Sequence, residues 1–274
     1  MKNGQVKTHI SASQVKTFNN CEAKWYFNKI LNIRVIPNGA RALGISFDEA
    51  LNHNFEQKVK TGLDLKPDIV VDVFTEQYKK VATHTDFGKE KKADLRETGI
   101  QLVKLYQQKA SPKILPRLVQ PEFTVSFEGV DWDVELRPDL ITKDGIIIDN
   151  KTTTRSPMKN LDGKYFPCNE DDKFQLTTYD ICINNSKQVI PKTTRIIYAV
   201  KKKDPVIIEV DLDPPKPTDK KYWTLLVSQA KQRMNLIKEE KLSPRPNRSS
   251  YLCSRTWCGF WDKCEKQFGG RVKQ

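Results

Sequence analysis

Two aspartates and one lysine are spaced in the sequence so that a β-hairpin would bring them together. Asp139 precedes a predicted turn through residues 143–145, and Asp149 and Lys151 follow three consecutive isoleucines at positions 146–148. A turn at that place sets Asp139 directly opposite Asp149 in the paired strands. Side chains two apart in a strand point the same way, so Lys151 shares this face with Asp149. The spacing therefore predicts two carboxylates and one ammonium group at a single point.

Such a group of side chains has a defined chemistry. Carboxylates a few ångströms apart repel each other in a partly buried site, so a cation is expected between them, and oxygen ligands favour Mg²⁺ or Mn²⁺. The lysine can then position or deprotonate a water molecule, while the metal polarises a phosphodiester and stabilises the charge that develops on its oxygens. The alternative is a hairpin whose acids simply face water, because an Asp-x-Lys sequence is common by chance.

Three cysteines near the C-terminus form a second candidate site. Cys253, Cys258 and Cys264 are separated by four and five residues. The thiol buffers of the cytosol act against disulfides, and three clustered thiols need a fourth ligand to hold a metal. Of the other three cysteines, Cys168 and Cys182 are not predicted to bind metal, and Cys182 is expected to be a small buried residue of a helix.

The first 115 residues are predicted to be mainly helical. Apolar residues recur at helical spacing in four segments, residues 11–31, 42–59, 70–81 and 93–110. The first segment is predicted to be one helix or a broken pair of helices, and it contains Cys21.

The rest of the chain alternates between strand and helix patterns. Predicted strands cover residues 123–127, 134–140, 145–152, 194–200 and 205–211, and predicted helices cover residues 169–183 and 218–240. This order is typical of a mixed sheet flanked by helices, so the predicted fold class is α/β. We predict one domain over residues 1–274, with a helical region at 1–115, a core at 116–240 and a cysteine-rich tail at 241–274.

Charge and hydropathy limit the kind of partner. The 47 lysines and arginines exceed the 34 acidic residues, which gives a formal net charge of +13. A polyanion such as nucleic acid is the natural partner for such a chain, although charge alone says nothing about sequence specificity. No stretch has the roughly 20 consecutive apolar residues of a membrane span, and residues 1–7 lack a secretory signal, so a cytoplasmic protein is expected.

The acidic constellation resembles that of the PD-(D/E)XK nuclease superfamily. In that superfamily an acidic residue ends one strand, an apolar strand ends in acidic-x-Lys, and a helix follows with Gln and Tyr one turn apart. The resemblance implies that Asp139 and Asp149 are metal ligands, together with the main-chain carbonyl of Asn150. It also implies that Lys151 acts on the water. Gln175 and Tyr179, one turn apart on the helix, are then expected to line the site. A purely structural Gln-Tyr pair is the alternative.

Members similar to RecB have a further metal ligand on a helix before the sheet. They carry a glycine followed four residues later by histidine, and here Gly44 is followed by Asp48. Aspartate is a good ligand for a hard metal, so the resemblance implies that Asp48 binds the cation with an altered metal preference. Asp48 also lies beside the apolar stripe formed by Leu51 and Phe55, which places it toward the protein interior.

The cysteines resemble those of RecB-like and CRISPR-associated exonucleases that carry an iron-sulfur cluster. The segment around Cys21 is similar to the N-terminal cysteine segment that these nucleases pair with three C-terminal cysteines. The resemblance implies that Cys21 joins Cys253, Cys258 and Cys264 around a 4Fe-4S cluster, with zinc as the alternative. The usual trio begins with two intervening residues, whereas this chain has four.

Together these features lead to the hypothesis of a metal-dependent DNA nuclease, either an exonuclease or an endonuclease, acting on single-stranded DNA or on DNA with free ends. Two alternatives remain: a DNA-binding protein without turnover, and a nuclease subunit that needs a helicase or recombination partner. By analogy, a chain of this size without a fused helicase fits a phage or stand-alone enzyme.

Overall fold

The computed structural model describes residues 8–128, 132–186, 191–255 and 257–269. The prediction about a secretory signal concerns residues 1–7, which lie outside the described residues. The helices are α1 (Ala12–Asn20), α2 (Glu22–Lys29), α3 (Gly39–Thr61), α4 (Pro67–Ala82), α5 (Lys92–Lys109), the 3-10 helix η1 (Ser111–Lys113), α6 (Glu170–Ser186), α7 (Pro217–Lys238) and α8 (Trp261–Phe268). The strands are β1 (Thr8–Ser11), β2 (Pro116–Val119), β3 (Phe123–Ser126), β4 (Trp132–Leu136), β5 (Leu140–Thr142), β6 (Ile146–Thr153), β7 (Met158–Lys159), β8 (Tyr165–Phe166), β9 (Thr193–Val200) and β10 (Val206–Leu212).

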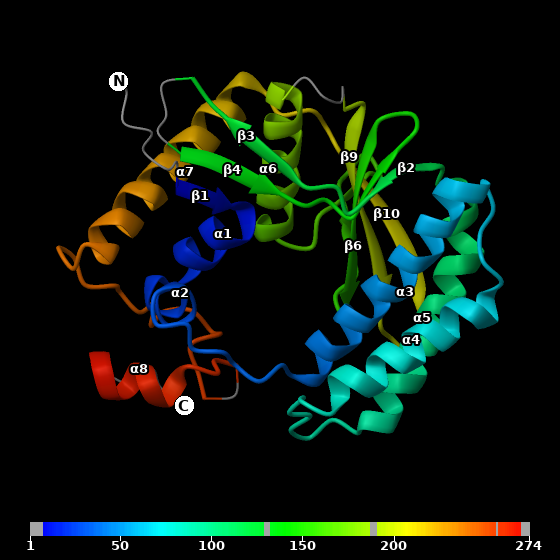
Figure 1. Ribbon diagram of the computed structural model, residues 1–274, viewed down its shortest axis with the longest axis horizontal. Coiled ribbons are helices and arrows are strands. Elements are labelled where there is room, and N and C mark those ends of the chain that lie inside the picture. Colours follow the sequence, from blue (N-terminus) through cyan, green and yellow to red (C-terminus); the bar gives the residue numbers. More distant parts are fainter. Residues whose placement is uncertain (1–7, 129–131, 187–190, 256, 270–274) are drawn as a thin grey trace.

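A five-stranded mixed sheet forms the centre of the molecule. Its order is β10-β9-β6-β5-β2, with β6 and β9 parallel and the other neighbours antiparallel. Figure 1 shows helices α3, α4 and α5 against one face of this sheet, and α6 and α7 on the other side. The predicted α/β class with a mixed sheet flanked by helices is confirmed. Among the described residues, no helix is both long and apolar enough to cross a membrane.

Strand β6 separates two apolar cores. Ile147 packs into the core shared with α6 and α7, whereas Ile148 packs into the core shared with α3, α4 and α5. Consecutive side chains of a strand point to opposite faces, so a strand covered by helices on both sides needs an unbroken apolar run. This explains the three isoleucines, and it confirms that Ile148 points into the opposite layer from the odd-numbered residues.

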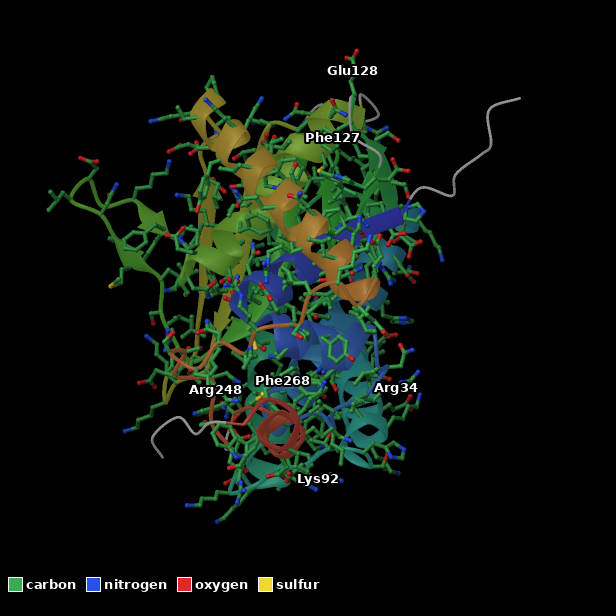
Figure 2. All side chains as sticks on the ribbon, turned by 90° about the vertical axis from the view of Figure 1, so that its left-hand side faces the viewer. Arg34, Lys92, Phe127, Glu128, Arg248 and Phe268 are labelled. Atoms are coloured by element: carbon green, nitrogen blue, oxygen red, sulfur yellow. The ribbon has the colours of Figure 1, made fainter. Side chains whose placement is uncertain are left out.

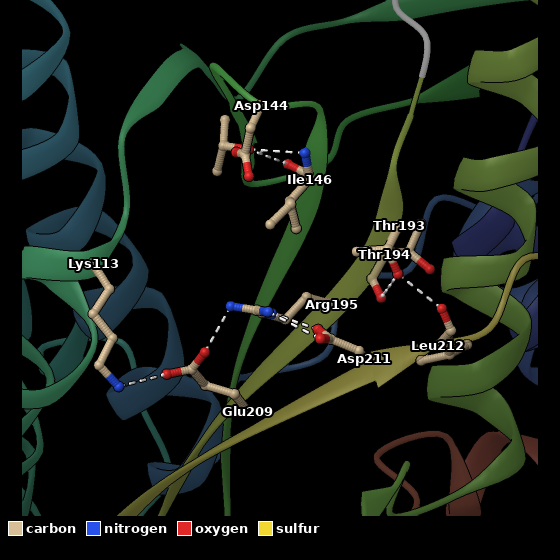
Figure 3. Close-up of polar contacts among 10 residues, drawn as sticks. Lys113, Asp144, Ile146, Thr193, Thr194, Arg195, Glu209, Asp211 and Leu212 are labelled. Carbon is tan, nitrogen blue, oxygen red and sulfur yellow. Dashed lines mark hydrogen bonds and ion pairs between the residues drawn. The ribbon is translucent and has the colours of Figure 1, made fainter.

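The β5–β6 hairpin has the register that the sequence predicts. Leu140 pairs with Ile148 in this hairpin. Leu140 directly follows Asp139 and Ile148 directly precedes Asp149, so the two aspartates lie at opposite positions just beyond the last pair. The turn is closed by Thr142, whose hydroxyl donates to Asp144 Oδ1 at 2.6 Å and accepts from the amide of Ile146 at 2.8 Å (Figure 3). Gly145 completes the turn with a φ of 84°, a left-handed conformation that glycine adopts without strain.

Ion pairs hold the edge strand β10 to β9. Arg195 of β9 reaches Asp211 Oδ1 at 2.5 Å and Glu209 Oε2 at 2.7 Å, and Lys113 reaches the other oxygen of Glu209 at 3.3 Å (Figure 3). These residues lie at the partly exposed edge of the sheet, where each such pair contributes about 1 kcal/mol or less. The ladder therefore fixes the position of β10 more than it stabilises the whole protein.

The predicted strand over residues 134–140 is wrong as a single element. Strand β4 ends at Leu136 and belongs to a separate three-stranded sheet, order β1-β4-β3, whereas β5 begins at Leu140 in the central sheet. Pro138 lies in the break, and proline has no amide hydrogen to donate to a strand ladder. The chain therefore changes sheets in this segment, and Asp139 lies immediately before β5.

The helical N-terminal region agrees with the prediction in type and differs at its ends. Ser11 ends a short strand, β1, and accepts from the amide of Gln14, so α1 begins one residue later. The break between α1 and α2 falls at Cys21, which selects the predicted broken pair of helices. Helix α3 begins earlier than predicted because Asn38 caps it, accepting from the amide of Arg41 at 3.0 Å.

Candidate active site

Asp149, Lys151 and Gln175 form a closed ring of polar contacts at the end of β6. Lys151 Nζ lies 2.7 Å from Asp149 Oδ2 and donates to Gln175 Oε1 at 3.3 Å. The Gln175 amide completes the ring by donating to Asp149 Oδ1 at 2.9 Å. Asp149 is 2% exposed, so its charge is balanced by these two partners and not by solvent. The structure thus brings the predicted strand residues and the predicted helix residue together.

Tyr179 extends this ring along helix α6. It lies one turn after Gln175, whose amide donates to the Tyr179 hydroxyl at 2.8 Å. The Tyr179 hydroxyl in turn donates to the main-chain carbonyl of Arg137 at 3.3 Å. Helix α6 starts at its own cap, because Asn169 Oδ1 accepts from the amide of Asp172 at 2.8 Å. The cap and the contact with Arg137 together set how far Gln175 reaches toward β6.

Asp139 is held against the backbone of β6. Its Oδ2 accepts from the amide of Asn150 at 2.6 Å, beyond the last paired residues of β5 and β6. The side chain of Asn150 leaves the strand toward the opposite layer, where its Oδ1 accepts from the Tyr106 hydroxyl at 2.7 Å. Asp149 thus belongs to β6, and Asp139 is bonded to the main chain of the next residue in that strand.

Asp48 reaches the site from helix α3. The helix crosses close to the end of β6, since a Cβ atom added at Gly44 would lie 3.5 Å from Thr152 Oγ1. One turn further along α3, Asp48 is near enough to Asp149 and Lys151 for their charges to affect its own pKa. Asp48 of α3 therefore lies within electrostatic range of the carboxylate and the ammonium group of β6.

Burial controls the protonation of the site. It raises the pKa of Asp48 to about 7, and the negative charge of Asp149 adds to this effect. Burial also raises the pKa of Asp139 well above its usual range, with further increases from Asp149 and Asp48. The pKa of Asp149 is raised by burial although Lys151 acts to lower it. Carboxyls of this kind keep their protons to higher pH than isolated aspartates do.

Lys151 shows the opposite balance. Burial alone would lower the pKa of this ammonium group, but the charges of Asp149 and Asp139 more than offset that effect, and the pKa is raised. Lys151 therefore carries its proton at neutral pH in this arrangement. It can donate hydrogen bonds and stabilise negative charge, and its surroundings oppose its use as a base.

The donor set fits a hard divalent cation. Its atoms are carboxylate oxygens with a main-chain carbonyl close by, which are the ligands that Mg²⁺ and Mn²⁺ prefer. Asp149 Oδ2 is buried and accepts no well-directed hydrogen bond, and its contact with Lys151 is an ion pair. Within the described ranges, however, no three His, Cys, Asp or Glu side chains are close enough as they stand to hold a metal ion. Asp139 and Asp149 instead face their protein partners.

Two cavities lie along α6, and one of them borders the polar ring. One, of about 470 Å³, is lined by Gln175 and Tyr179 and by Ser13 and Arg137. The other, of about 710 Å³, includes Lys16 in its lining. Of these two cavities, the first is the one whose lining includes a residue of the polar ring, Gln175.

Lys16 of helix α1 is a residue of this site that the sequence did not indicate. Its Nζ lies 3.7 Å from Asp171 Oδ2, and its charge acts to lower the pKa of Asp149. Asp172 is another, because it accepts from the Tyr198 hydroxyl at 2.8 Å and acts to raise the pKa of Asp149. Lys16 belongs to a short amphipathic helix with no chemical motif, so no local signal marked it.

The four cysteines predicted as ligands meet at one end of the molecule. Cys21 lies between α1 and α2, and Cys264 lies in α8, which packs beside α2 (Figure 1). Burial raises the pKa of the Cys253 thiol, and the nearby thiols of Cys258 and Cys21 raise it further. The pKa of Cys264 is raised in the same way by burial and by Cys21. All four are free thiols. Within the described part of the chain, no three of them lie close enough together as they stand to hold a metal ion.

Aromatic and polar contacts hold the two chain ends together around these thiols. Phe27 of α2 stacks on Phe260 at 5.6 Å between ring centroids and also contacts Phe268 of α8. Arg248 hydrogen bonds to the carbonyl of Gly269, and Figure 2 shows Arg248 and Phe268 at this end of the molecule. Four soft sulfur donors in such a setting fit an iron-sulfur cluster or zinc.

A buried carboxylate reinforces the same junction. Glu22 of α2 accepts two hydrogen bonds from Arg233 of α7, both at 2.8 Å, and one from the amide of Arg245 at 3.0 Å. Burial would raise the pKa of Glu22, but these donors lower it below its usual value. By contrast, Cys182 of α6 is 0% exposed and faces the apolar core, which confirms that it is a small buried residue of a helix.

Comparison with known proteins places these features in a family. A proposed exonuclease from Eubacterium rectale, known from its crystal structure, aligns over 90% of this chain and 87% of its own, with a TM-score of 0.60 and 14% identity. The crystal structure of SSO0001 aligns over 85% of this chain and 80% of its own, with a TM-score of 0.41 and 11% identity. No curated protein matches the sequence. The family description "PD-(D/E)XK nuclease superfamily" matches residues 9–265, and the chain therefore belongs to the PD-(D/E)XK nuclease superfamily.

Proposed function

We propose that the protein is a Mg²⁺- or Mn²⁺-dependent deoxyribonuclease that degrades DNA from free ends. Membership of the superfamily supports a nuclease that hydrolyses phosphodiester bonds, and such nucleases usually use divalent metals such as Mg²⁺. The observation that carries the proposal is the polar ring of Asp149, Lys151 and Gln175, with Asp139 bonded to the next residue of β6. The charge of Asp149 also acts on Asp48 of α3.

In this proposal the metal ligands are Asp48, Asp139, Asp149 and the carbonyl of Asn150. Holding a cation requires Asp149 to turn from Lys151, whereas Asp139 can keep Oδ2 on the main-chain amide of Asn150 and offer its other carboxylate oxygen. When bound, the cation supplies Lewis-acid polarisation of the phosphate and lowers the pKa of a coordinated water. The carboxylates bring the negative charge that selects such an ion.

Lys151 and the helix residues have separate roles in this proposal. Lys151 keeps its proton, so it orients the attacking water and stabilises negative charge on the phosphate. Gln175 holds Lys151 and Asp149 in register through its two hydrogen bonds, and Tyr179 fixes the Gln175 amide. The pKa of Tyr179 is raised by burial and by Asp149, so its hydroxyl remains a donor at neutral pH.

DNA is the proposed substrate because the chain is strongly basic. The net charge of +13 favours a polyanion, and Lys16 brings one of these positive charges to the site. Action at free ends is supported by the structural similarity to the proposed exonuclease from Eubacterium rectale.

The cysteines are proposed to bind a 4Fe-4S cluster, as in the RecB-like branch with four cysteines. Cys21 joins Cys253, Cys258 and Cys264 of the tail formed by residues 241–274, and the cluster staples the two chain ends. The support is that Cys21, Cys258 and Cys264 lie in one aromatic cluster and that Cys253 is close enough to Cys258 and Cys21 for them to affect the pKa of its thiol. Zinc is the competing occupant.

The deciding experiment is cleavage of end-labelled linear DNA, both single- and double-stranded, beside circular DNA. The protein is purified anaerobically and assayed with Mn²⁺ or Mg²⁺. An exonuclease degrades the linear substrates progressively from one end and leaves the circles intact. Degradation of circles would assign an endonuclease instead.

Two aspartate variants make this assay specific to the site. Asp149→Asn removes a candidate ligand with little change in shape, and it is expected to abolish cleavage. Asp180→Asn is the matched control, because Asp180 is also buried and its pKa is also raised by burial, but its contact is with Asn184. Equal cleavage by both variants would reject the assignment. A folded wild-type protein that binds DNA without cleaving it would favour the binding or obligate-subunit alternatives.

The cluster is tested by analysis of the anaerobic protein. A 4Fe-4S cluster gives iron and acid-labile sulfide in equal amounts, whereas a zinc site gives zinc without sulfide. Cys253→Ser is expected to lose the cluster, and Cys182→Ser is the control because Cys182 lies in the core away from the other thiols. Retention of full iron by Cys253→Ser would remove Cys253 from the ligand set.

A further inference from the structure

One buried hydroxyl belongs to neither chemical motif but touches the candidate site from behind. Tyr106 lies in helix α5 and is 0% exposed. Its ring packs edge-on against Phe47 at 5.7 Å and Phe55 at 6.3 Å, both of helix α3. Phe47 immediately precedes Asp48, so the ring of Tyr106 lies against the helix that delivers this carboxylate.

The hydroxyl of Tyr106 is directed at β6. It donates to Asn150 Oδ1 at 2.7 Å, a contact that is fully buried. Asn150 is 5% exposed, so no solvent molecule substitutes easily for this donor.

Asn150 links this contact to the carboxylates. Its side chain faces the layer of helices α3 to α5, while its main-chain amide donates to Asp139 Oδ2 at 2.6 Å. The same residue lies between Asp149 and Lys151 in the strand. Rotation or displacement of Asn150 would therefore change the position of both aspartates relative to the lysine.

We propose that Tyr106 is a positioning residue of the active site, which acts through Asn150 to orient Asp139 and the end of β6 for cation binding. As a positioning role for catalysis this rests on the proposed function. The geometric part, that Tyr106 restrains Asn150 and its bond to Asp139, stands on the contacts alone. Outer hydrogen-bond partners of metal ligands commonly control ligand orientation in this way, and their loss typically weakens metal binding by about 10- to 100-fold.

A second buried tyrosine gives a matched control. Tyr78 of α4 is 1% exposed, belongs to the same apolar core, and donates to the carbonyl of Lys92 at 3.0 Å. Tyr78→Phe and Tyr106→Phe each remove one hydroxyl and keep the ring. A role for Tyr106 in packing alone predicts the same behaviour for the two variants, whereas a positioning role predicts a difference at β6.

The first measurement is the rate of main-chain amide hydrogen exchange at residue 150, monitored by NMR in metal-free protein. Tyr106→Phe is expected to speed this exchange about three- to tenfold, the effect of weakening one hydrogen bond. Tyr78→Phe is expected to leave it unchanged. An unchanged rate in Tyr106→Phe, or an equal increase in Tyr78→Phe, would overturn the inference.

The second measurement is Mn²⁺ binding by calorimetry, with the Mn²⁺ concentration needed for half-maximal cleavage as a parallel readout. Tyr106→Phe is expected to bind Mn²⁺ about tenfold more weakly than wild type or Tyr78→Phe. Asn150→Ala removes the acceptor of the same bond but keeps the main-chain groups of residue 150. The double variant Tyr106→Phe with Asn150→Ala is expected to bind Mn²⁺ no more weakly than Asn150→Ala alone. Additive losses would contradict action through Asn150.

The two measurements separate the inference from the proposed function. If wild-type protein neither binds Mn²⁺ nor cleaves DNA, the proposed function fails, and the exchange rate at residue 150 still decides whether Tyr106 restrains Asn150. If wild type cleaves DNA but Tyr106→Phe matches Tyr78→Phe in exchange and in Mn²⁺ affinity, the inference fails alone.

Discussion

Replacing Asp48 by asparagine is expected to stabilise the metal-free protein at alkaline pH. Burial raises the pKa of Asp48 from an ordinary value of 3.8 to about 7. A carboxyl whose pKa is raised in the folded state contributes stability that is fully present below the pKa of the unfolded chain. That stability is lost as the pH rises, and the loss is complete above about 7.

The size of the effect follows from the same values. Between pH 5 and the folded-state pKa of about 7 there are about 2 pH units. At about 1.4 kcal/mol per unit, wild-type protein should lose about 3 kcal/mol of stability from Asp48 between pH 5 and pH 8. Asp48→Asn has a similar shape and no charge to desolvate, so it should not show this loss. For a chain of this size the difference amounts to roughly 5–10 °C in Tm.

The assay is thermal unfolding at pH 5 and at pH 8 in the presence of a chelator of divalent ions. Wild type and Asp48→Asn should have similar Tm values at pH 5, and the variant should unfold at the higher temperature at pH 8. Glu49→Gln is the control, since Glu49 is an exposed neighbour on the same helix and should leave the pH dependence unchanged. Added Mn²⁺ should reverse the order at pH 8, because it binds the ionised carboxylates of wild type more tightly.

Two results would refute this reasoning. If Asp48→Asn and wild type lose the same Tm between pH 5 and pH 8, the carboxyl of Asp48 is not desolvated as the structure indicates. If Mn²⁺ raises the Tm of both proteins equally at pH 8, Asp48 is not a ligand of the cation.

Three further predictions concern the lysine, the pH dependence of metal binding, and the junction of the chain ends. Lys151→Ala should reduce cleavage at least about 100-fold and leave DNA affinity nearly unchanged in a filter-binding assay, because its proposed role is at the phosphate being cleaved; comparable losses in both assays would contradict this. Mn²⁺ affinity measured by calorimetry should rise with pH up to about 7 and release protons, since Asp48 is protonated below that pH and must ionise to bind; affinity independent of pH would exclude it. Glu22→Gln should lower stability by about 1–3 kcal/mol, because Arg233 loses a charged acceptor; an unchanged Tm would show that the junction does not depend on this pair.

Strand and helix periodicity was sufficient to predict much of the fold. The three isoleucines before Asp149 indicated a strand buried on both faces, and the hairpin register between Leu140 and Ile148 followed from the length of the turn. The break at Pro138 was missed because the apolar residues on either side of it continue the alternation. Only the pairing of strands shows that these residues belong to two different sheets.

The cysteine segments illustrate what spacing alone leaves undecided. The C-terminal trio is visible as a cluster in the sequence, but the approach of Cys21 depends on the packing of Phe27 against Phe260 and on the ion pairs of Glu22. These contacts join segments from opposite ends of the chain. Such contacts arise from burial of apolar surface and from pairing of buried charge, neither of which has a fixed sequence spacing.

The candidate active site divides in the same way. The sequence by itself determined which residues share a face: Asp149 with Lys151 on one strand, and Gln175 with Tyr179 on one helix, because two- and four-residue spacings are properties of the backbone. Only the tertiary structure decided that Lys16 lies near these carboxylates and that Tyr106 lies behind Asn150. Those positions result from how whole helices pack against the sheet, and that packing depends on the shape of the entire core.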